Sequence, residues 1–310
     1  MLLAIPALAA GAAAFSGLVY YEVLGRNAKL YNKIADATAD DTSKEMSEKI
    51  KTDERGVWFD NQTFEEIKTK NDRGQVLTGW LIKSEEPSDV FVLCSHGYRC
   101  NGKDEFRLVA KHYHEKGFNV LMVDHQAAGS SEGNLITFGY NESKDLVKWT
   151  HYLNETYGNN IKLILHGVSM GCATATIASG DNNLPENVKF TVADCGYTSM
   201  NEQFKAVLKS FGVPSFPLVP LTEMWNIIVG KFRYNEVNPL EAVKNAKVPM
   251  LFIHGKEDTF VPTEMVYRLY DACSSEKDIL VVDGAIHARS YFVNGDACDK
   301  KIDEFIKKYL

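Results

Sequence analysis

The sequence has little of what marks metal-binding, disulfide-rich or nucleic-acid-binding proteins. Its six cysteines form no Cys-x-x-Cys pair, and none stands at zinc-site spacing with a histidine. We expect small buried residues with free thiols, although a disulfide between unnamed partners stays open. The net charge is -7 and no block of basic residues is present, which argues against a nucleic-acid partner. The sequence indicates no metal and no organic cofactor.

The N-terminal stretch is a long run without charge. Residues 2–21 carry no charged side chain, and such a run is long enough to cross a bilayer as a helix. A secretory signal normally has a Lys or Arg before its apolar run, and this chain has none there. We therefore expect residues 1–25 to be an uncleaved membrane anchor. A cleaved signal stays open because residues 12–14 are alanines. Positive charges from Arg26 onward favour a cytoplasmic catalytic domain, and residues 26–56 are expected to form a tether or arm.

From about residue 57 the chain alternates between strand and helix patterns. A hairpin is expected first, because two β-type runs surround the turn sequence Asn71-Asp72-Arg73-Gly74. Such alternation is typical of βαβ units, so residues 57–310 are predicted to form an α/β fold, a mostly parallel sheet covered by helices on both faces. Apolar strands are expected at residues 90–95, 118–123, 161–166, 188–193, 248–254 and 278–282, and helices at 104–116, 141–157, 172–178, 262–273 and 291–309.

One segment interrupts this alternation. Residues 200–238 show no convincing strand pattern, and we predict a helical cap inserted before the strand that precedes Asp258. Its apolar residues are expected to face the top of the sheet. The aromatic residues of the segment are Phe204, Phe211, Phe216, Trp225, Phe232 and Tyr234.

A candidate nucleophile lies in the stretch Gly167-Val168-Ser169-Met170-Gly171. This stretch follows an apolar strand pattern and precedes a run of small residues that suits a helix packed on a sheet. Strand, Gly-x-Ser-x-Gly and helix together form the pattern of a nucleophile elbow. Residues 129–133 also match Gly-x-Ser-x-Gly, but they follow no strand directly, and we interpret them as a loop.

A serine hydroxyl needs a base that takes its proton and a carboxylate that orients the base. His287 follows the last predicted strand and is the candidate base. Asp258 is the favoured acid because the order Ser, Asp, His is expected for this fold, and Asp194, which also ends a strand, is the alternative. The oxyanion of the intermediate requires backbone N–H donors, for which Met170 and Tyr98 are the candidates.

Six sequence segments in this order resemble those of the α/β-hydrolases, and within them the bacterial serine-aminopeptidase-like branch, many of whose members carry an N-terminal membrane segment. The resemblance implies Ser169 as nucleophile, Asp258 as acid, His287 as base, and Tyr98 and Met170 as oxyanion donors. One departure is the loop after Asp124, which usually runs Arg-Gly-His-Gly. The matching segments are Ser95-His96-Gly97-Tyr98, Asp124 with residues 129–133, residues 167–171, residues 194–199, residues 254–258 and Gly284-Ala285-Ile286-His287.

These observations lead to the expectation of a serine hydrolase that cleaves carboxylic esters through an acyl-enzyme. The cap has no evident acidic cluster for the α-amino group of a peptide, which favours a small-molecule ester over a peptide. A peptidase or other amide hydrolase is the alternative with the same triad. A membrane-tethered binding protein without catalysis is the alternative from another class.

Overall fold

The computed structural model describes residues 4–29 and 52–310. The described strands are β1 (Glu65–Lys70), β2 (Val76–Ile82), β3 (Val90–Ser95), β4 (Asn119–Val123), β5 (Lys162–Val168), β6 (Val188–Asp194), β7 (Met250–Gly255) and β8 (Lys277–Val282). The described helices are α1 (Ala4–Leu24), α4 (Glu54–Asp60), α5 (Gly102–Glu105), α6 (Ala110–Glu115), α7 (Tyr140–Tyr157), α8 (Met170–Ser179), α9 (Met200–Ser210), α10 (Leu218–Val229), α11 (Pro239–Ala242), α12 (Glu264–Ala272) and α13 (Ser290–Tyr309), with 3-10 turns η1 (Tyr234–Glu236) and η2 (Val243–Asn245).

All of these strands join one sheet, in the order β1-β2-β4-β3-β5-β6-β7-β8. The expected hairpin is present: β1 pairs antiparallel with β2, which pairs antiparallel with β4. The remaining pairs are parallel. In register, Ser95 lies opposite Gly167 and Val168 lies opposite Asp194, so β3, β5 and β6 end together. The loops that follow these strands therefore meet at one edge of the sheet.

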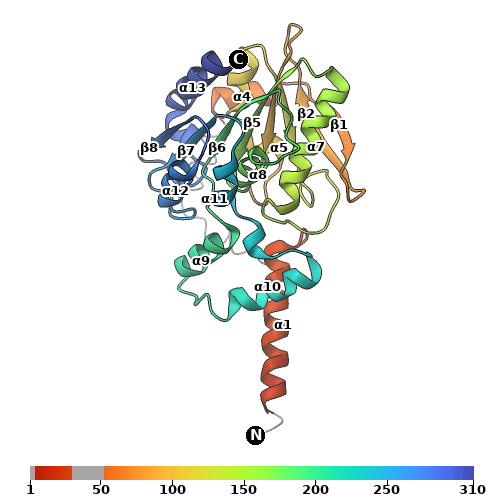
Figure 1. Ribbon diagram of the computed structural model, residues 1–310, viewed down its shortest axis with the longest axis vertical. Helices are drawn as coiled ribbons and strands as arrows, with labels where there is room; N and C mark the ends of the chain where they lie inside the picture. The colour runs from red at the N-terminus through yellow and green to blue at the C-terminus, as the bar shows by residue number, and fades with distance from the viewer. Residues whose placement is uncertain (1–3, 30–51) are drawn as a thin grey trace.

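Helices cover both faces of the sheet, as Figure 1 shows. One face packs against α6 and α13, and the other packs against α7, α8 and α12. The strands β3 and β4 are buried along their whole length, which explains their continuous apolar sequence. In α7, Leu146, Trp149 and Leu153 share the buried face, as their spacing predicts. The predicted α/β class and its mostly parallel sheet are confirmed.

The helix expected at residues 104–116 is wrong in detail. The chain forms two short helices, α5 and α6, separated by turns. Phe106 and Val109 are both buried in the core in this connection, and the N–H of Val109 bonds to the Phe106 carbonyl three residues back. The buried side chains of Phe106, Val109, Ala110 and Tyr113 keep the spacing of one apolar helix face, so the turns do not change which residues face the core.

Between β6 and β7 the chain forms α9, α10, η1, α11 and η2 and, within this described stretch, no strand. Phe204 packs edge-on against Phe138 and Tyr234, in the direction expected for the cap. The expectation that the aromatic residues face the sheet is wrong for two of them, because Phe211 is 66% exposed and Phe216 is 77% exposed. Both belong to the connection between α9 and α10, and Figure 1 shows this connection on the side of the cap away from the sheet.

The helix α1 does not support the expected membrane anchor. Among residues 4–29 and 52–310, no helix is both long and apolar enough to cross a membrane. The predicted tether falls largely on residues 30–51, which lie outside the described part of the chain.

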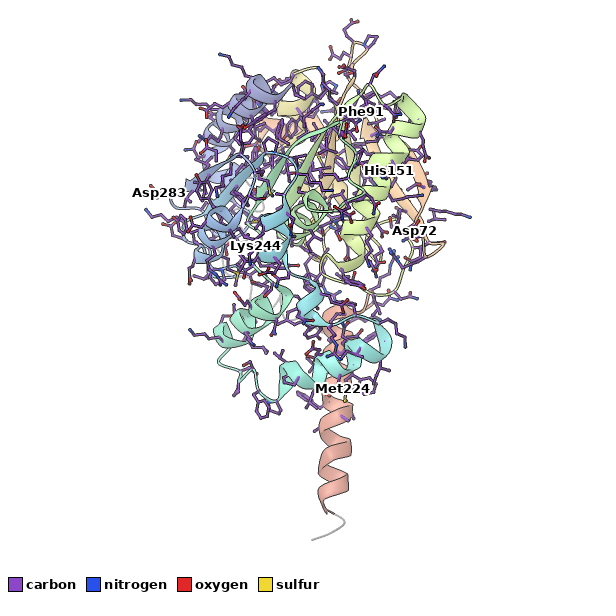
Figure 2. All side chains as sticks on the ribbon, viewed as in Figure 1. Asp72, Phe91, His151, Met224, Lys244 and Asp283 are labelled. Atoms are coloured by element: carbon purple, nitrogen blue, oxygen red, sulfur yellow. The ribbon has the colours of Figure 1, made fainter. Side chains whose placement is uncertain are left out.

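Instead, α1 packs against α10 of the insertion, and Met224 marks where the two helices cross in Figure 2. The indole N–H of Trp225 donates to the Ala13 carbonyl (3.1 Å), and the hydroxyl of Tyr20 donates to Asn226 Oδ1 (3.3 Å). A Cβ at Gly17 would lie 3.0 Å from the Trp225 ring, so the small residue permits this close approach. Gly17 therefore permits the close packing of α1 on α10.

Candidate active site

Ser169 lies at the turn between β5 and α8. Its φ of 56° and ψ of -115° are rarely adopted by residues with a side chain, and its N–H donates to the Asp194 carbonyl (2.8 Å). Gly171 makes the turn possible, because a Cβ there would lie 1.8 Å from the Ser95 carbonyl oxygen. The local geometry thus has the strand, strained turn and helix that the sequence pattern predicts.

The second Gly-x-Ser-x-Gly sequence has a different environment. Ser131 lies in a loop, 1% exposed, where its hydroxyl donates to the Asp124 carbonyl (2.6 Å) and accepts the N–H of Thr78 (2.8 Å). Both bonds tie the loop to neighbouring backbone. The interpretation of residues 129–133 as a loop is correct.

The structure brings Ser169, His287 and Asp258 together from three separate loops. Ser169 Oγ lies 2.9 Å from His287 Nε2, and His287 Nδ1 lies 2.7 Å from Asp258 Oδ2. A carboxylate accepts, so Nδ1 carries the proton and Nε2 is left to accept from the serine hydroxyl. This is the order of bonds in which a serine is deprotonated by an imidazole that a carboxylate orients.

Asp258 is held as an anion although only 4% of it is exposed. Its Oδ1 accepts the N–H groups of Phe260 (3.0 Å) and Val261 (2.9 Å), and its Oδ2 faces His287 and His254. Burial opposes ionisation, but the hydrogen bonds from His254 and His287 outweigh it and lower the pKa of Asp258 to about 2. The carboxylate is therefore charged throughout the neutral range.

His254 belongs to this site, although no role is assigned to it from the sequence. Its Nε2 lies 3.2 Å from Asp258 Oδ2 and 3.0 Å from the Val261 carbonyl, so one N–H holds both the carboxylate and its loop. Its position at the end of β7, four residues before Asp258, is visible in the sequence. The direction of the side chain, which decides the contact, is not.

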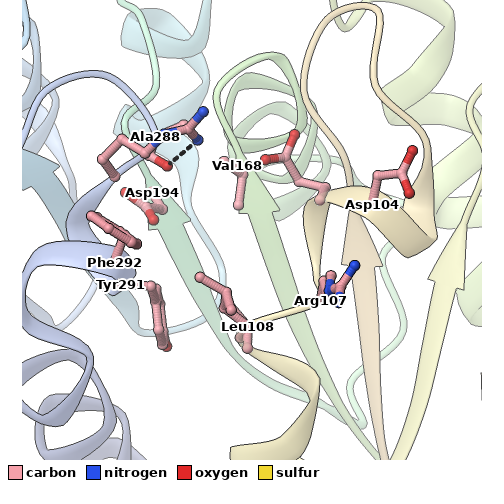
Figure 3. A pocket seen from close by; sticks show the side chains of 11 residues that line it. Asp104, Arg107, Leu108, Val168, Asp194, Ala288, Tyr291 and Phe292 are labelled. Atoms are coloured by element: carbon pink, nitrogen blue, oxygen red, sulfur yellow. Dashed lines mark hydrogen bonds between the residues drawn. The ribbon is translucent and has the colours of Figure 1, made fainter. Parts of the chain in front are cut away.

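Asp194, the alternative acid, lies elsewhere. It is 3% exposed, and His287 Nδ1 is already bonded to Asp258. Within the described residues, its Oδ1 has no hydrogen-bond partner. Figure 3 shows its side chain on a small pocket with Val168, Ala288 and Tyr291. Burial raises the pKa of Asp194 to about 7, against a weaker opposing effect of His254.

This burial predicts a pH-dependent penalty that Asp194→Asn should remove. Because the folded-state pKa is raised, the folded protein binds a proton that the unfolded chain has lost, and stability falls as pH rises from about 4 to about 7. From pH 4 to pH 8, we expect the free energy of unfolding of the variant to rise by a few kcal/mol relative to that of the wild type, since one pKa unit is worth about 1.4 kcal/mol. Denaturant unfolding at both pH values measures this, and a difference in stability that is the same at both would contradict it.

The two candidate oxyanion donors lie in segments that meet at Ser169. Met170 begins α8, where the first N–H groups of a helix have no partner within it. The loop with Tyr98 approaches closely, since a Cβ on Gly97 would lie 3.4 Å from Ser169 Cβ. The N–H of Gly97 donates to Glu105 Oε2 (2.9 Å), a contact that links β3 to α5 and that no sequence pattern identified.

His96 holds the same loop from the other side. Its Nδ1 lies 2.7 Å from the Gly97 carbonyl, to which it donates, and its Nε2 accepts the N–H of His125 (3.0 Å). Burial lowers the pKa of His96, which keeps the ring neutral and able to accept. The loop after β3 is thus held at Gly97 by two side chains: Glu105 accepts its N–H, and His96 donates to its carbonyl.

Cysteine and metal chemistry are not evident near these residues. All six cysteines have free thiols, and every one except Cys100 is buried. In the stretches that the structure covers, residues 4–29 and 52–310, no group of three or more His, Cys, Asp or Glu side chains is arranged to hold a metal ion.

Comparison with known proteins gives relatives of several kinds. The uncharacterized protein YqkD of Bacillus subtilis is 29% identical over 234 residues, 75% of this chain and 76% of that protein. The lysophosphatidylserine lipase ABHD12 of Danio rerio is 24% identical over 204 residues, 64% of this chain and 51% of that protein. The solved structure of the Pyrococcus furiosus esterase Pf2001 has a TM-score of 0.66 at 23% identity, covering 80% of this chain and 92% of that one, and it shares the α/β-hydrolase fold.

A family model gives the assignment. Residues 105–310 match the model of Peptidase_S9, the prolyl oligopeptidase family. The serine-aminopeptidase-like branch that the sequence motifs resemble is not confirmed by this match. The matched residues span more than half of the chain and include Ser169, Asp258 and His287. The chain therefore belongs to the prolyl oligopeptidase family of α/β hydrolases.

Proposed function

We propose that the protein hydrolyses carboxylic esters with Ser169 as nucleophile, His287 as general base and acid, and Asp258 as the carboxylate that orients His287. The observation that carries the proposal is the hydrogen-bonded chain of these three side chains, 2.9 Å and 2.7 Å in its two steps. Serine gains nucleophilicity only when a base takes its proton during attack, and this chain supplies that base.

In the first half of the reaction, Ser169 Oγ bonds to the ester carbonyl carbon while its proton moves to His287 Nε2. The carbonyl oxygen becomes an oxyanion, which the N–H groups of Tyr98 and Met170 would stabilise. Asp258 stabilises the imidazolium. When the carbon–oxygen bond of the ester breaks, His287 returns the proton to the leaving alkoxide, and an alcohol departs from acyl-Ser169.

In the second half, water attacks the acyl carbon and gives its proton to His287 Nε2. The bond to Ser169 Oγ then breaks, Oγ takes the proton back, and a carboxylic acid is released. The enzyme returns to its starting state with one water consumed. All steps use side chains and backbone groups of this chain.

Aromatic side chains near the triad favour an apolar acyl group. The Phe260 ring lies 4.9 Å from the His287 ring, and the Tyr98 ring stacks on Phe138 at 4.9 Å. Phe204 of α9 extends this group toward the cap. Such aromatic surfaces suit apolar acyl chains better than they suit charged acyl groups. A relative described as a lysophosphatidylserine lipase is consistent with this preference.

Amide hydrolysis is the second candidate, because the family is named for a peptidase. Recognition of a peptide α-amino group would require an available carboxylate. Two acidic residues of the cap already have partners: Glu202 pairs with Arg268 (2.6 Å), and Glu223 accepts the N–H of Tyr234 (3.1 Å). This favours esters.

A substrate panel separates the two candidates. We expect purified full-length protein to hydrolyse p-nitrophenyl esters, with kcat/KM rising as the acyl chain lengthens, and to leave aminoacyl and prolyl anilides nearly untouched. Release of p-nitrophenol and of the anilide product is measured by absorbance. Turnover of the anilides with kcat/KM above that of every ester would overturn the ester assignment in favour of amide hydrolysis.

A further inference from the structure

The C-terminal end of α1 has an unusual set of partners. The last carbonyl groups of a helix receive no hydrogen bond from an N–H group of the helix itself, so their donors come from outside it. The Tyr21 carbonyl accepts the N–H of Gly25 (2.7 Å), and the Leu24 carbonyl accepts the N–H of Ile136 (2.8 Å). The last turn contains no basic residue. The carbonyls of Glu22 and Val23 therefore depend on donors from outside the helix.

Those donors come from the loop after β3. The Tyr98 hydroxyl donates to the Val23 carbonyl (2.5 Å), and Arg99 Nη2 donates to the carbonyls of Glu22 (2.8 Å) and Gly25 (3.1 Å). Arg99 Nε also donates to the Tyr98 hydroxyl (2.8 Å). A guanidinium at this point lies at the negative end of the helix dipole, which favours it further.

The same loop carries the proposed oxyanion donor, the N–H of Tyr98. Arg99, the next residue, has a φ of 56°, a left-handed conformation that is strained in a residue with a side chain. Such a conformation persists only where surrounding contacts hold it. Glu105 fixes the loop at Gly97, and α1 fixes it at Tyr98 and Arg99.

We infer that α1 positions the oxyanion loop, with Tyr98 and Arg99 as the residues through which it acts. The inference rests on the proposed function. It gives α1 a catalytic consequence although no α1 side chain bonds the triad among the described contacts. Because Trp225 and Asn226 of α10 hold α1 from the other side, α1 links the cap to the oxyanion loop.

A pair of matched substitutions tests this role. Arg99→Gln removes the guanidinium bonds from the oxyanion loop to the carbonyls of Glu22 and Gly25, and leaves the bond of the Tyr98 hydroxyl. Arg26→Gln is the control, since Arg26 donates to the carbonyls of Gly129 (2.8 Å) and Gly133 (3.4 Å) in a different loop. Both variants lose an arginine beside the end of α1, so both should lower the melting temperature, but only the first alters the oxyanion loop.

For Arg99→Gln we expect kcat on a p-nitrophenyl ester to fall about tenfold, less than the 10² to 10³ for loss of a whole donor, with little change in KM. Affinity for an alkyl boronic acid, which forms a tetrahedral adduct on the serine, should fall by a similar factor. Arg26→Gln should keep both values within about twofold. Tyr98→Phe, which keeps the backbone N–H and loses the bond to α1, should show a smaller effect of the same kind, and it serves if Arg99→Gln does not fold.

Amide hydrogen exchange over residues 96–101 adds a readout that needs no turnover. We expect faster exchange there in Arg99→Gln and unchanged exchange in Arg26→Gln. If the Arg99 and Tyr98 variants had the same kcat, boronic-acid affinity and hydrogen exchange as the wild type, the proposed role of α1 would be wrong. A wild type without esterase activity would overturn the proposed function alone, since faster loop exchange in Arg99→Gln would still support the link to α1.

Discussion

Replacing Ser169 with alanine is expected to lower kcat for ester hydrolysis by at least about 10⁴-fold. The hydroxyl is the only group in the described site that we assign to attack the carbonyl, and without it no acyl-enzyme can form. Residual turnover would come from water attack assisted by the oxyanion donors. A fluorophosphonate probe, which bonds covalently to an activated serine, should label the wild type and fail to label the variant.

Ser131→Ala is the matched control. Ser131 stands at the centre of the other Gly-x-Ser-x-Gly sequence, and its hydroxyl makes two backbone hydrogen bonds in a buried loop. Its loss should reduce stability by about 1–3 kcal/mol, because a buried N–H of Thr78 loses its acceptor. Labelling should persist. If the Ser169 variant kept its label while the Ser131 variant lost it, the assignment of the nucleophile would be wrong.

Asp258→Asn is expected to lower kcat by about 10³ to 10⁴-fold while leaving the fold intact. The side-chain oxygen that accepts from Phe260 and Val261 would stay in place, so the new amide nitrogen would face His287. An amide nitrogen donates, and His287 Nδ1 would have to accept. The proton would then lie on Nε2, the atom that has to take the proton of Ser169.

Asp194→Asn supplies the control for this experiment. It makes the same chemical change at a buried carboxylate one strand away, but its kcat at pH 7 should stay within a few-fold of the wild type. Steady-state kinetics with one p-nitrophenyl ester compares both variants. Equal losses in the two variants would mean that the hydrogen bond between Asp258 and His287 does not determine the protonation of the base.

The sequence was sufficient for the fold because its signals are local and repeated. The apolar runs of β3 to β7 alternate with helices, and a parallel sheet covered by helices buries such strands on both faces. The catalytic candidates could be proposed because Ser169, Asp258 and His287 each follow a strand, and parallel strands end at one edge. The structure brings these three side chains within hydrogen-bond distance.

What could not be predicted depends on contacts between distant segments. The contact of His254 with Asp258 depends on the direction of the His254 ring at the end of β7, which the sequence does not reveal. The small residues of α1 led to the expectation of a membrane anchor, and the sequence gives no sign that Gly17 and Ala13 contact Trp225 of a helix about 200 residues away. The exposure of Phe211 and Phe216 follows from the path of the chain between α9 and α10.

The position of α1 bears on where the folded unit begins. A catalytic fragment cut at residue 57, as strand patterns alone would suggest, would lose the backbone acceptors of Tyr98 and Arg99 and would uncover the Trp225 ring. We expect such a fragment to be prone to aggregation and slow in turnover even with every triad residue present. Recombinant versions that retain the helix ending at Leu24 should be the better material for crystallisation and assay.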